Sequence, residues 1–190
     1  MHVVAILLAA GSSRRFGGEK LLAPYRGRPL IEHALAALTS SPGVETTIVV
    51  VHPRFPLPPE RPRCRFVVNP EHEEGMGSSL RAGVRAAPAE TDAYLVALAD
   101  MPTIGPELIA SLIACYRAAG KRIVVPMYQG RRGHPVMISG ELREALLGIR
   151  GDVGAREIIR QHPEWAGEFE TGDGAVVYDV DAPADLEAGG

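Results

Sequence analysis

The feature that most restricts the fold of this chain is an alternation of strand-like apolar runs with segments of helical spacing. Val3–Leu8 is apolar at every position, which is typical of a strand covered on both faces, since a half-exposed strand would alternate with polar residues. Further runs of strand length lie at Thr46–Val51, Arg65–Val68, Tyr94–Leu98 and Arg122–Val125. Helices are predicted between them, through Leu30–Leu38, Ser78–Ala87 and Leu108–Tyr116. The alternation predicts a three-layer α/β/α fold with a mostly parallel, mixed sheet.

The last third of the chain changes its pattern without indicating a second domain. Strands are predicted at Pro135–Ile138 and Val176–Val180, around two short helices at Glu141–Leu147 and Ala155–Gln161. Five prolines between residues 53 and 62 predict an extended surface connection, because proline continues neither a helix nor an inner strand. Neither flank of this connection is large enough to fold alone, so residues 1–190 are interpreted as a single domain.

Charge and cysteine content exclude several classes of function. The net charge of −3 gives no basic field for nucleic acid or an anionic membrane, and neither is predicted as a partner. Cys64 and Cys115 are too few for a disulfide framework and lack metal-ligand spacing, so they are interpreted as buried free thiols. Val3–Ala10 is too short to cross a bilayer and no basic segment precedes it, which predicts a cytoplasmic protein.

The segment from Leu8 to Lys20, LAAGSSRRFGGEK, follows the first strand at the place where a phosphate-binding turn belongs. Its three glycines let backbone N–H groups approach an anion closely. Arg15 can hold phosphate oxygens with two donors, and Lys20 supplies a mobile point charge. The segment is neither G-x-x-x-x-G-K-[ST] nor G-x-G-x-x-G, so P-loop hydrolysis and dinucleotide binding are not indicated. Taken alone, it is equally well interpreted as a flexible loop with solvated charges.

Carboxylates follow two of the predicted strands. Asp100 ends the apolar run from Tyr94 to Ala99, and Asp179-Val180-Asp181 ends the run from Val176. One or two carboxylates together with substrate phosphates are the usual ligands of Mg²⁺ in proteins. On a regular strand Asp179 and Asp181 would point to opposite faces, so Asp181 is the expected ligand beside Asp100, with Asp179 in support. The alternative for this pair is turn formation and helix capping before Pro183.

These segments, with others in a fixed order, resemble the MobA-like NTP transferases, especially molybdenum cofactor cytidylyltransferases. The resemblance runs from about residue 3 to residue 187, and Phe16 stands where the family usually has methionine. Its motifs are Leu8–Lys20, Leu21–Pro24, Gly27–Ile31, Asn69-Pro70 with Gly75–Leu80, Leu98–Pro102, Gly133–Pro135, Gly151–Arg156 and Asp179–Leu186. It implies the Rossmann-like fold of the nucleotide-diphospho-sugar transferase type and transfer of a nucleoside monophosphate to molybdopterin-type cofactor, with release of pyrophosphate.

The resemblance also implies roles for individual residues. The nucleotide would be bound by Leu8, Ala9, Ala10, Gly11, Ser12, Ser13, Arg15 and Lys20, with weaker base or ribose contacts from His52, Asn69 and Ser79. Arg15, Lys20 and Asp100 would be catalytic, and Asp100 would hold Mg²⁺ with Asp181. The acceptor would meet His134, Asp152 and Arg156, although Gly-His-Pro is equally consistent with a shaped turn.

The identity of the nucleotide and of the partner stays open at this point. CTP is predicted because Ala10 stands where guanylyltransferases of the family tend to carry a second glycine. The alternatives are GTP with the same acceptor, and a sugar-phosphate or polyol-phosphate acceptor. Another is a non-catalytic module that delivers the cofactor to a xanthine-dehydrogenase-like apo-enzyme. A pure carrier needs no metal carboxylates, so Asp100 and Asp181 together with Arg15 and Lys20 favour an enzyme.

Overall fold

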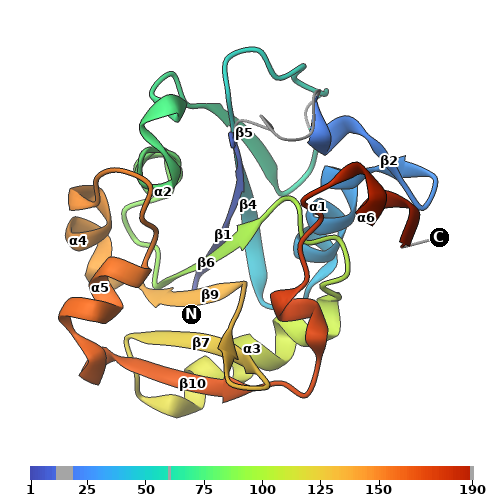
Figure 1. The fold of residues 1–190 in the computed structure, drawn as a ribbon. Helices are drawn as coiled ribbons and strands as arrows, with labels where there is room; N and C mark the ends of the chain where they lie inside the picture. Colours follow the sequence, from blue (N-terminus) through green and yellow to red (C-terminus); the bar gives the residue numbers. More distant parts are fainter. Residues whose placement is uncertain (12–18, 60, 189–190) are drawn as a thin grey trace.

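A mixed eight-stranded sheet runs through the molecule (Figure 1), whose computed structural model describes residues 1–11, 19–59 and 61–188. Its strands are β1 (Val3–Ala9), β4 (Val44–Val51), β5 (Cys64–Val68), β6 (Ala93–Leu98), β7 (Ile123–Tyr128), β8 (Arg131–Arg132), β9 (Val136–Ser139) and β10 (Ala166–Glu170). The order is β10-β7-β9-β6-β1-β4-β5, with β8 paired to β7. Only β8 and β9 run against the other strands of the sheet, which confirms the predicted mostly parallel, mixed sheet.

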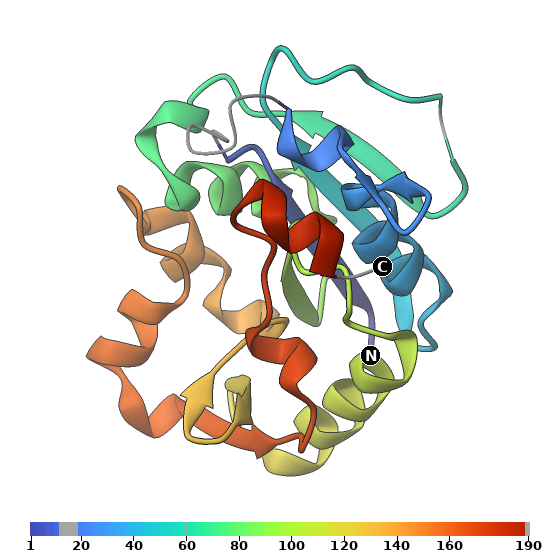
Figure 2. The ribbon, with the colours of Figure 1, turned by 45° about the vertical axis from the view of Figure 1, so that its right-hand side comes forward.

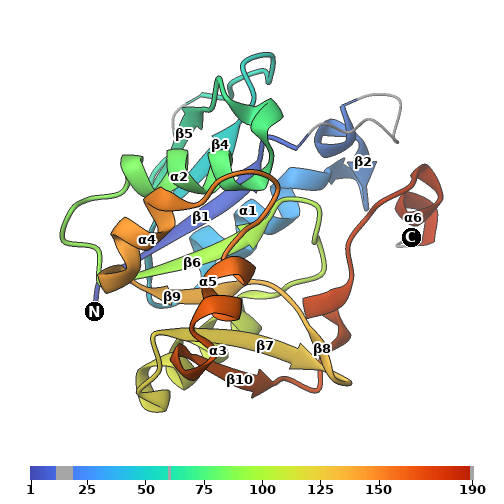
Figure 3. The ribbon, with the colours of Figure 1, turned by 60° about the vertical axis from the view of Figure 1, so that its left-hand side comes forward.

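Helices cover both faces of the sheet. One face carries α1 (Leu30–Ser40) and α3 (Pro106–Ala119), and the other carries α2 (Met76–Ala86), α4 (Arg143–Gly148) and α5 (Arg156–Gln161). Figure 1 shows α2, α4 and α5 on one side of the central strands and α1 on the other, and Figure 3 turns the α2 side toward the viewer. The predicted three-layer α/β/α fold is therefore confirmed.

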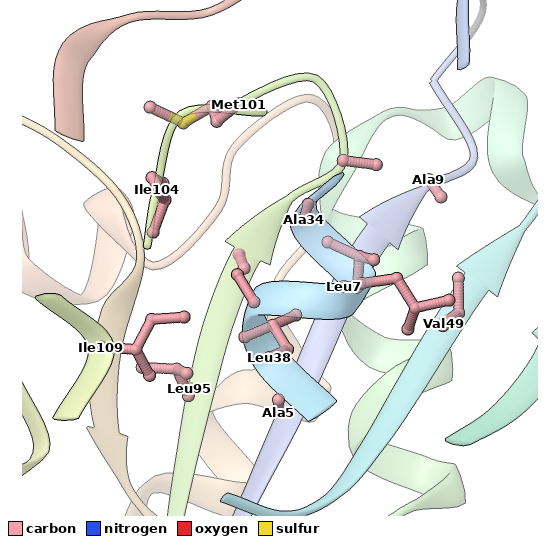
Figure 4. Packing of buried hydrophobic residues seen from close by; sticks show 14 of the residues in the cluster. Ala5, Leu7, Ala9, Ala34, Leu38, Val49, Leu95, Met101, Ile104 and Ile109 are labelled. Carbon is pink, nitrogen blue, oxygen red and sulfur yellow. The ribbon is translucent and has the colours of Figure 1, made fainter. Parts of the chain in front are cut away.

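The opening strand is apolar throughout because both of its faces are buried. Val3, Ala5, Leu7 and Ala9 belong to the core under α1 and α3, whereas the alternate residues of β1 belong to the core under α2, α4 and α5. Figure 4 shows the first of these cores, with side chains of β1, β4 and β6 gathered against Leu38 of α1. Burial on both faces stabilises such a strand by roughly 1.5–3 kcal/mol for each large apolar side chain.

One predicted strand was wrong. Val176–Val180 contains no strand: Gly174–Val177 forms a 3₁₀ helix, whose first turn begins where Asp173 accepts a hydrogen bond from the amide of Ala175 at 2.9 Å. Val176 and Val180 are fully buried, so these residues are apolar because they pack in the core, although they form no strand. The edge strand of this region is instead β10, which the sequence Ala-Gly-Glu-Phe-Glu did not indicate because edge strands need few apolar residues. The other predicted strands and helices are confirmed within a few residues at their ends.

Smaller elements complete the part of the chain that the structure describes. A ribbon of β2 (Pro24–Tyr25) and β3 (Arg28–Pro29) precedes α1, and the C-terminal helix α6 (Pro183–Ala188) lies beside β2. Short 3₁₀ helices occur at Lys20–Leu22, His72–Glu74, Gly140–Leu142 and Pro163–Trp165. Cys64 and Cys115 are free, as predicted, but only partly buried, and burial raises the pKa of the Cys64 thiol. Within the described residues, every helix is too short or too polar to cross a membrane.

Candidate functional site

A cavity of about 650 Å³ opens at the carboxyl ends of β1 and β6, where the strand order of the sheet reverses. Leu8 of β1 lies opposite Leu98 of β6, and the amide of Ala99 donates to the carbonyl of Leu8 at 3.1 Å. The loops that follow these two strands therefore begin at one level and face one opening. Of the predicted nucleotide-binding residues, the described lining holds Leu8, Ala9, Ala10, Gly11, Lys20, Ser79 and Asp100. Ser12, Ser13 and Arg15 lie outside the described residues.

The charged centre of this cavity is the Lys20 ammonium group. Its Nζ donates to Oδ2 of Asp100 at 2.9 Å and lies 3.5 Å from Oδ1 of Asp181. Lys20 is buried, and Leu21, the next residue of the same 3₁₀ turn, belongs to the core. Nζ of Lys20 lies 2.9 Å from the Asp100 oxygen and 3.5 Å from the Asp181 oxygen, so these two oxygens are separated by no more than the sum of the two distances. A single Mg²⁺ with bonds of about 2.1 Å spans about 4.2 Å between two ligand oxygens, a separation that rotation of these two side chains can reach.

Asp181 reaches the cavity by a route that the sequence did not predict. Asp100 does follow β6, but Asp181 lies on the loop before α6 and not at a strand end. The loop is held to the sheet by the amide of Val180, which donates to the carbonyl of Asp100 at 2.9 Å. Figure 2 shows the C-terminal segment (red) crossing this end of the sheet on its way to α6. A backbone contact thus brings the two carboxylates together, although only Asp100 follows a strand as predicted.

Asp179 contributes charge from outside the cavity lining. Partial desolvation raises its pKa, and the neighbouring carboxylates of Asp181 and Asp100 raise it further, while Lys20 opposes them. A raised pKa means that the anion is disfavoured, as expected where acidic groups crowd together without enough positive charge. Within the described residues, three or more His, Cys, Asp or Glu side chains nowhere gather as a ready metal cage. A metal at Asp100 and Asp181 would therefore have to complete its coordination with phosphate oxygens and water.

Another part of the cavity lining comes from the loop before α2. Buried Arg81 holds Glu74 through two hydrogen bonds, of 2.9 Å and 2.5 Å, and also donates to the carbonyl of Ile149 at 2.6 Å. The hydrogen bonds from Arg81, together with one from the amide of Gly151, lower the pKa of Glu74 to about 2. Arg81 therefore links the loop before α2, which carries Glu74, to the loop after α4, which carries Ile149. Glu74 stays ionised in the cavity lining.

The Gly-Met-Gly motif is explained by the closeness of these two loops. A Cβ on Gly75, which has a φ of +115°, would lie 2.7 Å from the Cα of Asp152, and one on Gly77 would lie 2.7 Å from the carbonyl oxygen of Gly151. Both positions therefore exclude a side chain. Asp152 lines the cavity, and its Oδ1 accepts a hydrogen bond from the amide of Met76 at the start of α2. The hydrogen bond that the carboxylate of this predicted acceptor residue, Asp152, accepts in the structure thus comes from the backbone of α2.

Two of the predicted base or ribose contacts lie behind the lining. Asn69 is buried, and its Nδ2 donates to the hydroxyls of Ser78 and Ser79 at 2.9 Å and 3.1 Å. It therefore orients Ser79, which does line the cavity. His52 is also outside the lining, and its Nε2 lies 3.0 Å from Oε2 of Glu19.

His72 is a residue of the cavity that sequence reasoning missed. It lines the opening, its ring lies 5.7 Å from that of His52, and its buried Nδ1 is without a hydrogen-bond partner among the described residues. The signal that could have found it is its place in a loop directly after β5, at the same edge of the sheet as Gly11 and Asp100.

The predicted acceptor residues are only partly brought together. His134 is outside the cavity lining, and its Nδ1 lies 3.5 Å from the carbonyl of Val96. Burial lowers its pKa, the charge of Asp100 opposes this, and the charge of Arg156 adds to it. Arg156 begins α5 at the surface, also outside the lining. His134 is thus near enough to both Asp100 and Arg156 for their charges to act on it.

Comparison with known proteins finds one matching family model, and relatives whose names describe different activities. A model of the MobA-like NTP transferase domain matches residues 5–165. Nicotine blue oxidoreductase of Paenarthrobacter nicotinovorans is 37% identical over 194 residues, which cover 94% of this chain and 92% of that protein. A probable molybdenum cofactor guanylyltransferase of Thermococcus gammatolerans is 31% identical, covering 76% of this chain and 73% of that one. A 2-C-methyl-D-erythritol 4-phosphate cytidylyltransferase of Cereibacter sphaeroides is 33% identical over 72% of this chain and 65% of that one.

Solved structures show the same fold. Rv0371c from Mycobacterium tuberculosis superposes with a TM-score of 0.82 at 24% identity, covering 99% of this chain and 97% of that one. The same protein complexed with manganese superposes with a TM-score of 0.79 at 22% identity, covering 100% of this chain and 98% of that one. The expected nucleotide-diphospho-sugar transferase type of fold is therefore confirmed.

Proposed function

The chain belongs to the MobA-like NTP transferase family, and from that premise we propose that it transfers a nucleoside monophosphate from an NTP to a phosphorylated acceptor. The observation that carries this proposal is the contact of one buried lysine with two carboxylates at the carboxyl edge of the sheet. Phosphoryl transfers need positioning and charge neutralisation more than covalent help, and this edge offers both kinds of group.

Asp100 and Asp181 fit a divalent cation, which we propose to be Mg²⁺. The fit rests on the Lys20 ammonium, because a cation already contacts both carboxylates in this structure. Their oxygen ligands are of the kind that Mg²⁺ prefers, and the phosphates of the substrate would supply the rest. When bound, the metal would neutralise charge on the phosphate oxygens.

The residues of the chain then have distinct tasks. Backbone groups of Leu8, Ala9 and Ala10 would hold the base, and Lys20 would turn from the carboxylates to the triphosphate, with Arg15 on the leaving pyrophosphate. An oxygen of the acceptor phosphate attacks the α-phosphorus, a new P–O bond forms, and the bond to the β-phosphate oxygen breaks. Pyrophosphate carries away the electron pair of that bond. No protein nucleophile is required.

For the substrates, we propose CTP and a molybdopterin-type acceptor. Ala10 supports CTP by its resemblance to the cytidylyltransferase motif, and it lines the cavity directly after β1. The relatives include both a probable guanylyltransferase and a cytidylyltransferase, so the choice between GTP and CTP has to be measured. The acceptor is proposed from the molybdenum cofactor relative. Asp152, which lines the cavity, would contact it, and His134 and Arg156, outside the described lining, would act on it only from a distance. The product would pass to a xanthine-dehydrogenase-like apo-enzyme in the cytoplasm.

A second candidate is an oxidoreductase, which the 37% identity with nicotine blue oxidoreductase favours. The charged groups of the described lining, Lys20 with Asp100 and Asp181, are suited to phosphate and a divalent metal. Transfer of a nucleotide is therefore the function that the geometry supports better.

The decisive experiment measures pyrophosphate release with each of the four NTPs. The acceptors are molybdopterin-type cofactor, sugar phosphates and polyol phosphates, in the presence and absence of Mg²⁺. Pyrophosphate is expected only with metal, and fastest with CTP and the cofactor. A parallel assay follows NADH and NADPH oxidation with nicotine blue. Oxidation of either dinucleotide without pyrophosphate release from any NTP would replace the proposal by the second candidate, and stable cofactor binding without turnover would favour a carrier.

A further inference from the structure

The loop that carries Asp181 is shaped by a second carboxylate, that of Asp185. Oδ2 of Asp185 accepts hydrogen bonds from two successive amides, those of Asp181 at 2.8 Å and Ala182 at 2.7 Å. The next residue, Pro183, has no N–H and begins α6. One oxygen thus holds the backbone on both sides of the Asp181 side chain.

This arrangement fixes Asp181 from two directions. On one side the amide of Val180 is bound to the carbonyl of Asp100, and on the other the amides of Asp181 and Ala182 are bound to Asp185. The side chain of Asp181 is itself largely exposed and contacts Lys20 only at 3.5 Å, so packing does little to hold it. Its direction is therefore set by the backbone between these two anchors.

We propose that Asp185 is a positioning residue that holds Asp181 toward Asp100 so that the two carboxylates can share one divalent cation. This inference rests on the proposed function, because it gives Asp181 the task of a metal ligand. Asp185 is absent from the cavity lining and would not touch the metal or the substrates. Partners that orient a metal ligand typically change affinity for the metal by about 10- to 100-fold when they are removed.

The alternative is that Asp185 only stabilises the first turn of α6, which begins at Pro183. In that case its loss would loosen α6, a six-residue element near the end of the chain, without a specific effect on metal. Asp173 offers a matched control, since its Oδ1 accepts from the amide of Ala175 at 2.9 Å and caps the 3₁₀ helix of the same C-terminal segment. It also lies on an exposed turn and is absent from the cavity lining.

The test is Mn²⁺ binding to the full chain, followed by the loss of the free-ion signal in electron paramagnetic resonance, without nucleotide. Asp185→Ala should weaken Mn²⁺ binding about tenfold. Asp185→Asn should stay within about twofold of wild type, because its amide oxygen still accepts both hydrogen bonds. Asp173→Ala should bind like wild type. Circular dichroism of each variant confirms that the chain is folded.

A double variant separates positioning from a general structural role. In the Asp181→Ala background, Asp185→Ala should cause no further loss of Mn²⁺ affinity, because the ligand that it orients is gone. Equal binding by Asp185→Ala and wild type, or losses that add in the double variant, would overturn the role of Asp185 while leaving the metal site in place. Absence of saturable Mn²⁺ binding by the wild-type chain would overturn both the metal site and this role.

Discussion

Replacing Lys20 with methionine should have two opposite effects. It should lower the turnover of nucleotide and, in the protein without nucleotide, raise the affinity for a divalent metal. Both follow from the place of the ammonium group, which is buried and contacts Asp100 and Asp181 together. A metal that binds these carboxylates must first displace the ammonium, because two cations cannot share one site.

The size of the metal effect follows from the contact that is lost. A hydrogen bond of this charge-assisted kind contributes about 1.5–3 kcal/mol. The carboxylates of Asp100 and Asp181 are partly open to solvent, so the lower end of that range applies. Because ~1.4 kcal/mol corresponds to a factor of ten, Mn²⁺ should bind about tenfold more tightly to Lys20→Met than to wild type.

The effect on catalysis has the other sign. With nucleotide bound, Lys20 would donate to the triphosphate, and loss of one such electrostatic donor costs about 2–4 kcal/mol of transition-state stabilisation. The expected fall in kcat/KM is therefore roughly 30- to 1000-fold. Methionine keeps the length and apolar stem of the side chain, so the buried packing around Leu21 should survive.

Mn²⁺ titration by electron paramagnetic resonance and pyrophosphate release measure the two effects separately. Lys121→Met is a matched control, since Lys121 is exposed, donates to the carbonyl of Glu164 at 3.0 Å and is absent from the described cavity lining. Unchanged or weaker Mn²⁺ binding in Lys20→Met would refute the competition between ammonium and metal. A kcat/KM near that of wild type would remove Lys20 from the site altogether.

Three further predictions concern other residues of the cavity. Asp100→Asn should stay folded, as judged by circular dichroism, and lose turnover by roughly 1000-fold or more in the pyrophosphate assay, because the amide lacks the charge that a hard cation needs. CTP should be preferred to GTP by about 100-fold in competition assays, since a mismatched base leaves hydrogen-bonding groups unpaired, and equal use of GTP would contradict the assignment from Ala10. Glu74 has its pKa lowered from 4.5 to about 2, so its stabilising contribution is complete above pH 4.5 and is lost as the pH falls toward 2. Glu74→Gln should therefore flatten this part of the acid unfolding curve, and an unchanged curve would contradict the role of the Arg81 contact.

The layers of the fold were predictable because they depend on local pattern. Val3–Leu8 has no polar position and stands first in a series of alternating strand-like and helical segments, and as a strand it is buried under helices on both faces. Val176–Val180 is also largely apolar, but the strand predicted there was wrong. A short apolar run does not distinguish a strand from any other buried segment. β10 was missed for the converse reason, because it lies at the sheet edge and carries two glutamates.

The candidate site was predictable only where a strand end determines the position of a residue. Asp100 and the residues after β1 meet at one opening because parallel strands bring their carboxyl ends to the same edge. His134 and Arg156 lie outside the lining. Their positions depend on how β9 and α5 pack against the rest of the fold, which the local sequence pattern does not indicate. Asp181 is in the lining, but through hydrogen bonds to Asp100 and Asp185 that no periodicity indicates.

The negative charge of the cavity wall supports the binding of a divalent metal independently of any single metal ligand. Its described lining carries the carboxylates of Glu73, Glu74, Asp100, Asp152 and Asp181, against one lysine. Arg81 compensates Glu74 and Lys20 compensates Asp100, which leaves an excess of negative charge among the described residues of the lining. A nucleoside triphosphate and a phosphorylated acceptor are both anions, so they would be repelled from this wall in the absence of added cations. Affinity for nucleotide should therefore rise steeply with divalent metal and only weakly with monovalent salt, because monovalent ions screen the repulsion without bridging the carboxylates to the phosphates.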